Sequence, residues 1–138
     1  MNSLSITDRQ IGNVIILNID GDLRIGEGSD ALRKAIGRLL AEGQQRILLN
    51  MAHVAYIDSS GLGELIASYL TLQKKGGEIK LLRLTQRVRE LMSITKLLTV
   101  FDVYEDESAA LISFKGYVSD VTQHQSNIPK VAYHEMHS

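Results

Sequence analysis

An apolar run that leads directly into residues 58–63 (Asp-Ser-Ser-Gly-Leu-Gly) is the feature that most constrains the fold. The run occupies residues 54–57, and apolar residues at helical spacing follow the hexapeptide. Acidic and hydroxyl side chains at such a junction can accept hydrogen bonds from the unpaired N–H groups that begin a helix. The sequence therefore predicts a strand that turns into a helix, where the serines serve as a cap or present a hydroxyl for phosphate addition.

The same strand-then-helix pattern recurs along the chain. Strands are predicted near residues 4–8, 14–17, 47–49, 79–82 and 100–104. Helices are predicted between the later strands and after the last one, which gives the order β-β-α-β-α-β-α-β-α. Helical connections between successive strands imply parallel pairing, whereas the closely spaced first two strands indicate an antiparallel pair. The expected fold is α/β, a mixed sheet with helices packed against it.

Helix boundaries are also predicted from capping residues. Ser29 or Asp30 is expected to cap the first helix and Thr85 the third, while residues 105–107 open the last. The second helix is expected to bury one stripe and to end near residue 74, before two glycines. The residues of that stripe are Leu62, Leu65, Ile66, Tyr69 and Leu70.

Composition excludes several classes of function. The chain has no cysteine, which rules out disulfides and thiolate zinc sites and suits a reducing cytoplasm. A net charge of −1 and an aromatic content of 5% argue against a nucleic-acid partner. No apolar run approaches the length needed to cross a membrane, so no membrane partner is expected. We therefore expect a cytoplasmic module without a metal or another cofactor.

The chain divides into a domain at 1–116 and a polar tail at 117–138. The tail is rich in Ser, Gln, Asn and His and contains the only proline. This composition predicts a flexible segment. The alternative is that residues 128–133 dock on a partner or a neighbouring subunit.

The motif lacks the companions that catalysis would need. A nucleophile elbow requires glycine two residues before the serine, and residue 57 is isoleucine. His53 is the only histidine outside the tail, and it precedes the motif rather than pairing with it. We therefore expect no enzyme activity. Two further patterns remain open: the glycine-rich loop at 20–28 as a small-molecule or nucleotide site, and Arg83, Arg87, Arg89 and Lys96 as either a basic patch or a solvated helix face.

Residues 58–63, together with the turn Gly21-Asp22-Leu23 and the element order over residues 3–115, resemble the STAS-domain anti-sigma factor antagonists. The resemblance implies that Ser59 is phosphorylated and that Asp58, Ser60 and Gly61 support the phosphorylation site. It also implies a partner-binding surface made of Gly21, Asp22, Leu23, Arg24, Leu62 and Gly63.

By this resemblance, the unphosphorylated chain binds an anti-sigma factor that is also a serine kinase of the histidine-kinase-like ATPase type. Phosphorylation of Ser59 releases that partner, and a PP2C-type serine phosphatase reverses the modification. Arg24 departs from the pattern, since antagonists often carry an aspartate there. The alternative within this fold is a non-switching module of a stress-signalling scaffold or transport complex, in which Ser59 is only a helix cap.

Overall fold

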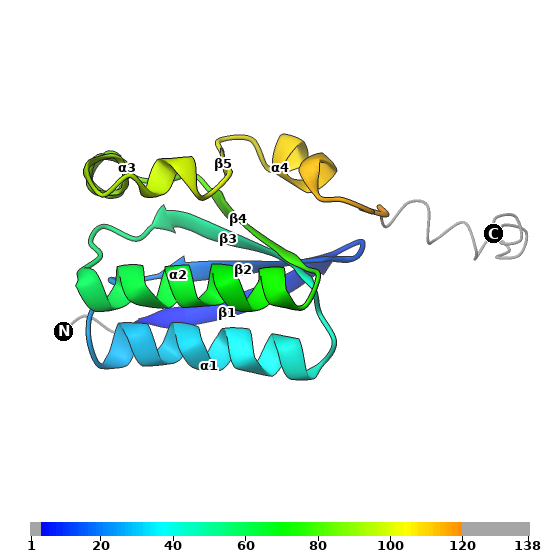
Figure 1. Cartoon of the computed structure of the whole chain (residues 1–138), viewed down its shortest axis with the longest axis horizontal. Helices are drawn as coiled ribbons and strands as arrows, with labels where there is room; N and C mark the ends of the chain where they lie inside the picture. The colour runs from blue at the N-terminus through cyan, green and yellow to red at the C-terminus, as the bar shows by residue number, and fades with distance from the viewer. Residues whose placement is uncertain (1–3, 120–138) are drawn as a thin grey trace, which may run out of the picture.

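The computed structural model describes residues 4–119 and confirms the predicted α/β fold and element order (Figure 1). In chain order the elements are β1 (Ser5–Ile11), β2 (Val14–Asp20), α1 (Glu27–Ala41), β3 (Arg46–His53), α2 (Ser59–Lys74), β4 (Glu78–Leu82), α3 (Gln86–Ile94), the 3-10 turn η1 (Leu97–Thr99), β5 (Val103–Tyr104) and α4 (Glu107–Ser113).

The five strands form one mixed sheet in the order β1-β2-β3-β4-β5. β1 and β2 pair antiparallel through a two-residue turn, in which Gly12 has a φ of 60°. The other three pairs are parallel, and each is joined by a helical crossover. The prediction of one antiparallel pair beside a parallel set is therefore correct.

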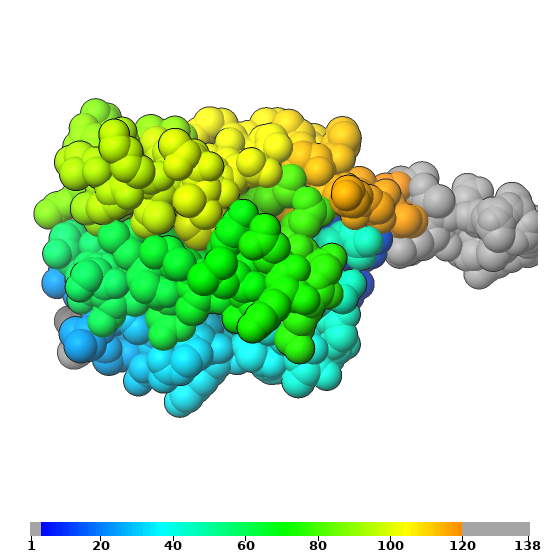
Figure 2. Space-filling view, in the orientation of Figure 1, coloured from blue at the N-terminus to red at the C-terminus, as the bar shows by residue number. Residues whose placement is uncertain are grey.

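Side chains that alternate along each strand build two apolar layers. In β2, Ile15, Leu17 and Ile19 pack with residues of α1, α2 and α3. Val14 and Ile16 point to the opposite face, where α4 covers them. Figure 2 shows α1, α2 and α3 as adjacent bands over the first face. The central strands are thus buried on both sides, as their continuous apolar runs require.

Lys80 is a buried charge beneath α4 and is 5% exposed. Its Nζ lies 3.2 Å from Asp102 Oδ2 and 3.3 Å from the carbonyl oxygen of Ser113. The rings of Tyr104 and Phe114 lie 5.8 and 5.2 Å from the same atom. A buried ammonium needs such partners, so this lysine joins the end of α4 to the outer strands.

The first helix begins earlier than predicted. α1 starts at Glu27 after Gly26, whose φ is 91°, and no side chain caps it. The predicted cap at Ser29 or Asp30 is therefore wrong. The hydroxyl of Ser29 instead donates to the carbonyl oxygen of Arg24 at 3.0 Å, and this side chain is buried inside the first turn.

The last strand and the stripe of the second helix also differ from the prediction. β5 covers only Val103–Tyr104, because Phe101 packs in the core, where its ring centroid lies 5.3 Å from that of Tyr69. The apolar run before β5 therefore serves core packing. In α2, Leu70 is 54% exposed, and Leu72 is buried in the core instead.

Residues just beyond the predicted domain boundary at 116 bind to the turn between β1 and β2. Val118 N donates to Asn13 Oδ1 at 2.8 Å, and Asn13 N donates to the carbonyl oxygen of Val118 at 3.2 Å. The first residues of the predicted tail are thus docked on the hairpin. Residues 120–138 lie outside the described part of the chain, so the flexible tail, and the alternative docking of residues 128–133, remain predictions.

The parallel arrangement brings three segments together at the carboxyl ends of the strands, which is the left end in Figure 1. These segments are the loop after β2, the segment after β3, and the beginning of α3. Functional groups in open α/β sheets commonly gather at this end. Both the loop at 20–28 and the motif at 58–63 lie here.

Candidate functional site

The carboxylate of Asp58 is the centre of the site. Asp58 is the N-cap of α2, and its Oδ1 accepts a hydrogen bond from Gly61 N at 3.0 Å. Its Oδ2 accepts from Ile25 N in the loop after β2, at 2.9 Å. These two backbone donors, that of Ile25 first, hold the pKa of the Asp58 carboxyl below its ordinary value. The side chain is therefore ionised near neutral pH and joins the loop to the helix.

Backbone hydrogen bonds fix the same loop along the segment that precedes the motif. Leu23 N donates to the carbonyl oxygen of Tyr56 at 3.0 Å, and Asp58 N donates to that of Leu23 at 3.1 Å. Leu23 and Ile57 thereby form a parallel bridge. The side chain of Leu23 has no exposed area, so this predicted partner-binding residue holds the loop in place and offers a partner no side-chain surface.

Two glycines allow the loop and the helices to come this close. A Cβ built on Gly61 would lie 2.3 Å from the carbonyl oxygen of Leu23, and one built on Gly28 would lie 2.4 Å from that of Asp22. The close approach of the loop's own backbone therefore explains why residue 28 is a glycine. No bound nucleotide phosphate is needed to explain it. Gly63 faces open space, and a Cβ there would meet no atom within 4 Å.

Ser59 is the first residue of α2 and is exposed. Its hydroxyl makes no hydrogen bond within residues 4–119, whereas Asp58 provides the cap. The interpretation of Ser59 as the helix cap is therefore wrong. Ser60, the next residue, is half-buried. The structure thus gives the two serines different access to another protein.

The remaining predicted partner-binding residues lie on the loop after β2 and at the start of α2. Gly21 and Asp22 are half-buried, Arg24 is exposed, and Leu62 packs partly into the core. These residues and the exposed Gly63 belong to the loop after β2 and to the start of α2, the two segments that Asp58 joins. The predicted residues therefore lie together in space.

The contacts of two arginines with the ring of Tyr56 were not predicted. The guanidinium carbon of Arg24 lies 4.3 Å from the ring centroid of Tyr56, and that of Arg87 lies 5.1 Å from the same centroid. Arg24 also donates to Asp22 Oδ2 at 3.2 Å. Arg87 belongs to the basic group noticed in the sequence, but nothing in the sequence links it to Tyr56. The role of Ile25 was also missed, since it acts through its backbone N–H.

The contacts of the groups around Ser59 indicate what chemistry the site can support. Within the described residues, no side-chain base contacts the Ser59 hydroxyl, which nucleophilic catalysis would require. The part of the chain between residues 4 and 119 also contains no group of three metal-ligating side chains. Over the same residues, no helix is long and apolar enough to cross a membrane.

Known proteins resemble this chain in sequence and in fold. The anti-sigma-B factor antagonist of Bacillus subtilis is 29% identical over 101 residues, which cover 73% of this chain and 91% of that protein. The anti-sigma F factor antagonist of Paenibacillus polymyxa is 28% identical, with 71% and 84% covered. A crystal structure from Thermotoga maritima gives a TM-score of 0.73 at 25% identity, with 78% of this chain and 92% of that chain covered. The family described as the STAS domain matches residues 5–110, and this chain belongs to that family.

Proposed function

We propose that this protein is an anti-sigma factor antagonist that works by partner switching, with Ser59 as the switch. Its unphosphorylated form binds an anti-sigma factor that is also a serine kinase of the histidine-kinase-like ATPase type. The kinase transfers the γ-phosphoryl group of ATP to Ser59 Oγ, and ADP and a proton are released. The modified chain then dissociates, and a PP2C-type phosphatase restores it by hydrolysis. In this scheme the chain binds and is modified, and it catalyses no step itself.

The observation that carries this proposal is the exposed hydroxyl of Ser59, which has no hydrogen-bond partner among residues 4–119 and lies at the edge of a fixed surface. Asp58 holds the first turn of α2 and the loop after β2 in one arrangement. A kinase can therefore reach Ser59 without unfolding the helix start. Similarity to two antagonists over most of their length supports the same role.

The energetics favour a switch in binding rather than in folding. A phosphate adds about −1.5 to −2 charges at neutral pH, and a helix N-terminus stabilises such charge by only about 0.3–1 kcal/mol. An unpaired or repelled charge at an interface can cost several kcal/mol. A cost of about 3–4 kcal/mol lowers affinity by roughly 100- to 1,000-fold, while the fold changes little.

The test compares three forms of the full chain: the native chain, Ser59→Ala, and a chain with phosphoserine installed at position 59 during translation. Each is immobilised and exposed to cytosol from the native host. We expect the first two to retain a protein that, when purified, transfers phosphate from ATP to Ser59. The phosphoserine form should bind that protein at least about 100-fold more weakly by calorimetry.

Ser60→Ala is the matched control, because it removes the neighbouring hydroxyl and leaves Ser59 in place. It should still accept one phosphate per chain. Equal affinity of the native and phosphoserine forms would contradict the proposal and favour the non-switching module.

A further inference from the structure

The basic residues near α3 fall into two sets with different partners. Arg83 Nε donates to the carbonyl oxygen of Glu105 at 3.2 Å, and Arg89 forms an ion pair of 2.8 Å with the Glu105 carboxylate. These two side chains therefore fasten α3 to the segment after β5. Arg87 takes no part in this and turns to Tyr56 instead.

Tyr56 thus carries two guanidinium groups on one ring. Stacking on an aromatic face attracts each cation, but the two positive charges repel each other. Asp22 offsets only the charge of Arg24, with Nη2 and Oδ2 separated by 3.2 Å. Within the described residues, Arg87 makes no ion pair. The cluster of Arg24, Tyr56 and Arg87 therefore has an excess of positive charge and capacity for another anion.

This cluster adjoins Ser59. Tyr56 precedes Ser59 by three residues on the same segment, and Arg24 precedes Ile25, whose N–H binds Asp58. The charge of Arg24 contributes to lowering the pKa of Asp58, the residue next to Ser59. The electrostatic effect of Arg24 on Asp58 thus extends to the residue that directly precedes Ser59.

A phosphate on Ser59 would need such cations. Asp58 already occupies the N–H groups of Gly61 and Ile25, and its own carboxylate is negative. The new dianion would therefore meet a neighbouring charge of the same sign, with these two donors already taken. Like charges held close together destabilise each other unless a cation lies between them or beside them.

We propose that Arg24 and Arg87, which lie over the ring of Tyr56 in the unmodified chain, turn to the phosphate of phosphorylated Ser59 and clamp it within the same chain. The proposal rests on the proposed function, since it takes Ser59 as the modified residue. Arginine suits this task, because its planar fork of donors matches the oxygens of a phosphate. Movement of the guanidinium groups from the ring to the phosphate would also change the surface around Tyr56, which lines a hollow of about 270 Å³ with Leu91 and Ile94. Phosphorylation would then alter the shape of the partner-facing surface as well as its charge.

The test needs no kinase, because phosphoserine can be installed at position 59 during translation. The second pKa of the phosphate is then followed by ³¹P NMR during a pH titration. A free phosphoserine titrates near about 6, and cations close by favour the dianion. We expect Arg24→Gln and Arg87→Gln each to raise this pKa by roughly 0.3–0.5 unit, and the double variant by more.

Arg89→Gln is the matched control, since Arg89 lies on the same helix but pairs with Glu105. It should leave the phosphate pKa unchanged. A second readout is the Tyr56 ring, whose proton resonances should move between the serine and phosphoserine forms.

If neither Arg24→Gln nor Arg87→Gln shifts the phosphate pKa, the clamp is refuted. This holds even if the variants weaken partner binding, which would assign the two cations to an acidic group of the partner. The clamp can fail in this way while phosphoserine still releases the partner, so its failure is distinct from that of the proposed function.

Discussion

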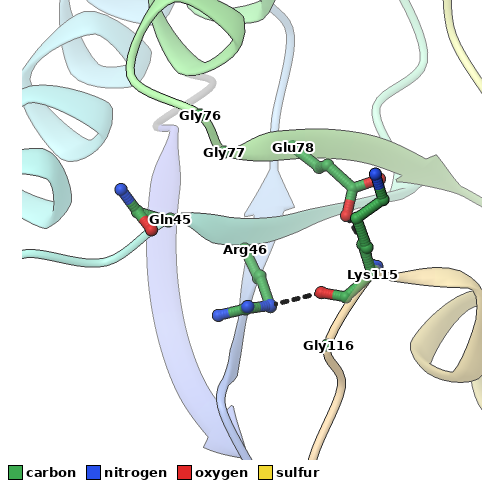
Figure 3. Close-up of a pocket in the computed structure, with 7 residues that line it drawn as sticks. All are labelled: Gln45, Arg46, Gly76, Gly77, Glu78, Lys115 and Gly116. Atoms are coloured by element: carbon green, nitrogen blue, oxygen red, sulfur yellow. Dashed lines mark hydrogen bonds between the residues drawn. The ribbon is translucent and has the colours of Figure 1, made fainter.

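The two ends of the sheet both carry glycines, arginines and a surface hollow, yet they differ in how their polar groups are satisfied. At the end opposite Ser59, a hollow of about 310 Å³ lies between Gln45, Gly76 and Gly116 (Figure 3). Arg46 Nε there donates to the carbonyl oxygen of Lys115 at 2.8 Å, and Lys115 N donates to Glu78 Oε1 at 2.8 Å. These groups hydrogen-bond to one another and join the segment after α4 to the first residues of β3 and β4.

At the other end, the hollow beside Tyr56 has a similar volume, about 270 Å³. There, however, the hydroxyl of Ser59 has no partner in the described part of the chain, and two guanidinium groups share one ring. The size of a hollow therefore does not distinguish the two ends. The distinction lies in polar groups that retain capacity for a ligand, a modification or a partner.

The strongest test of this contrast places the same substitution at both ends. Gly61→Ala brings a Cβ to 2.3 Å from the carbonyl oxygen of Leu23, and Gly77→Ala brings one to 2.4 Å from that of Gln45. Each should lower the free energy of unfolding by about 1–3 kcal/mol, because backbone atoms must shift. Only Gly61→Ala should also abolish partner binding, since it separates the loop from α2. Urea denaturation and calorimetric titration measure the two effects.

Gly63→Ala controls for the general effect of alanine in this helix. It meets open space and should raise the free energy of unfolding by up to about 1 kcal/mol. Loss of partner binding in Gly77→Ala to the same degree as in Gly61→Ala would remove the functional distinction between the ends.

A second test removes the carboxylate that joins the loop to the helix. Asp58→Ala should lower the urea midpoint at pH 7 more than Asp106→Ala does, because Asp106 caps α4 through Ala109 N alone. The pKa of Asp58 lies below the ordinary 3.8, so its contribution is complete above that value and is lost as pH falls through the folded-state pKa. The difference between the native chain and Asp58→Ala should therefore be constant from pH 5 to 7 and shrink in more acidic buffer. A difference that grows on acidification would contradict this assignment.

The smallest effect is expected at the opposite end. Arg46→Ala removes the hydrogen bond to Lys115 and should cost about 0.5–1.5 kcal/mol of unfolding free energy. Partner affinity should remain at the native value, because this arginine joins β3 to the segment after α4 at the end of the sheet opposite Ser59. A tenfold loss of affinity in Arg46→Ala would place part of the interface at this end.

The sequence predicted those features that depend on local pattern. The alternation of apolar runs determined the element order, and capping chemistry identified Thr85 and the start of the last helix correctly. The start of α1 was misplaced, because Ser29 satisfies a carbonyl in its own turn rather than a helix N–H. The spacing of apolar residues also gave no sign that Lys80 would be buried.

The candidate site shows the same division. Residues 58–63 identified Ser59 as a distinct position, since a capping sequence is local. The contact of Asp58 with Ile25 spans 33 residues and uses a backbone N–H. Because nearly every residue type has such a group, the identity of residue 25 does not predict the contact. The stacking of Arg87 on Tyr56 depends on how α3 packs against the segment before α2. Such contacts are determined by tertiary structure, and the sequence pattern alone could not predict them.

The hydrogen bond between Asp58 and Ile25 constrains the choice of amino acid at the two positions differently. Position 58 needs an acceptor, whereas position 25 contributes only its amide, which every residue except proline possesses. The Ile25 side chain is 76% exposed and takes no part in that bond. Position 25 can therefore diversify to match different partners, while the loop that carries it stays anchored.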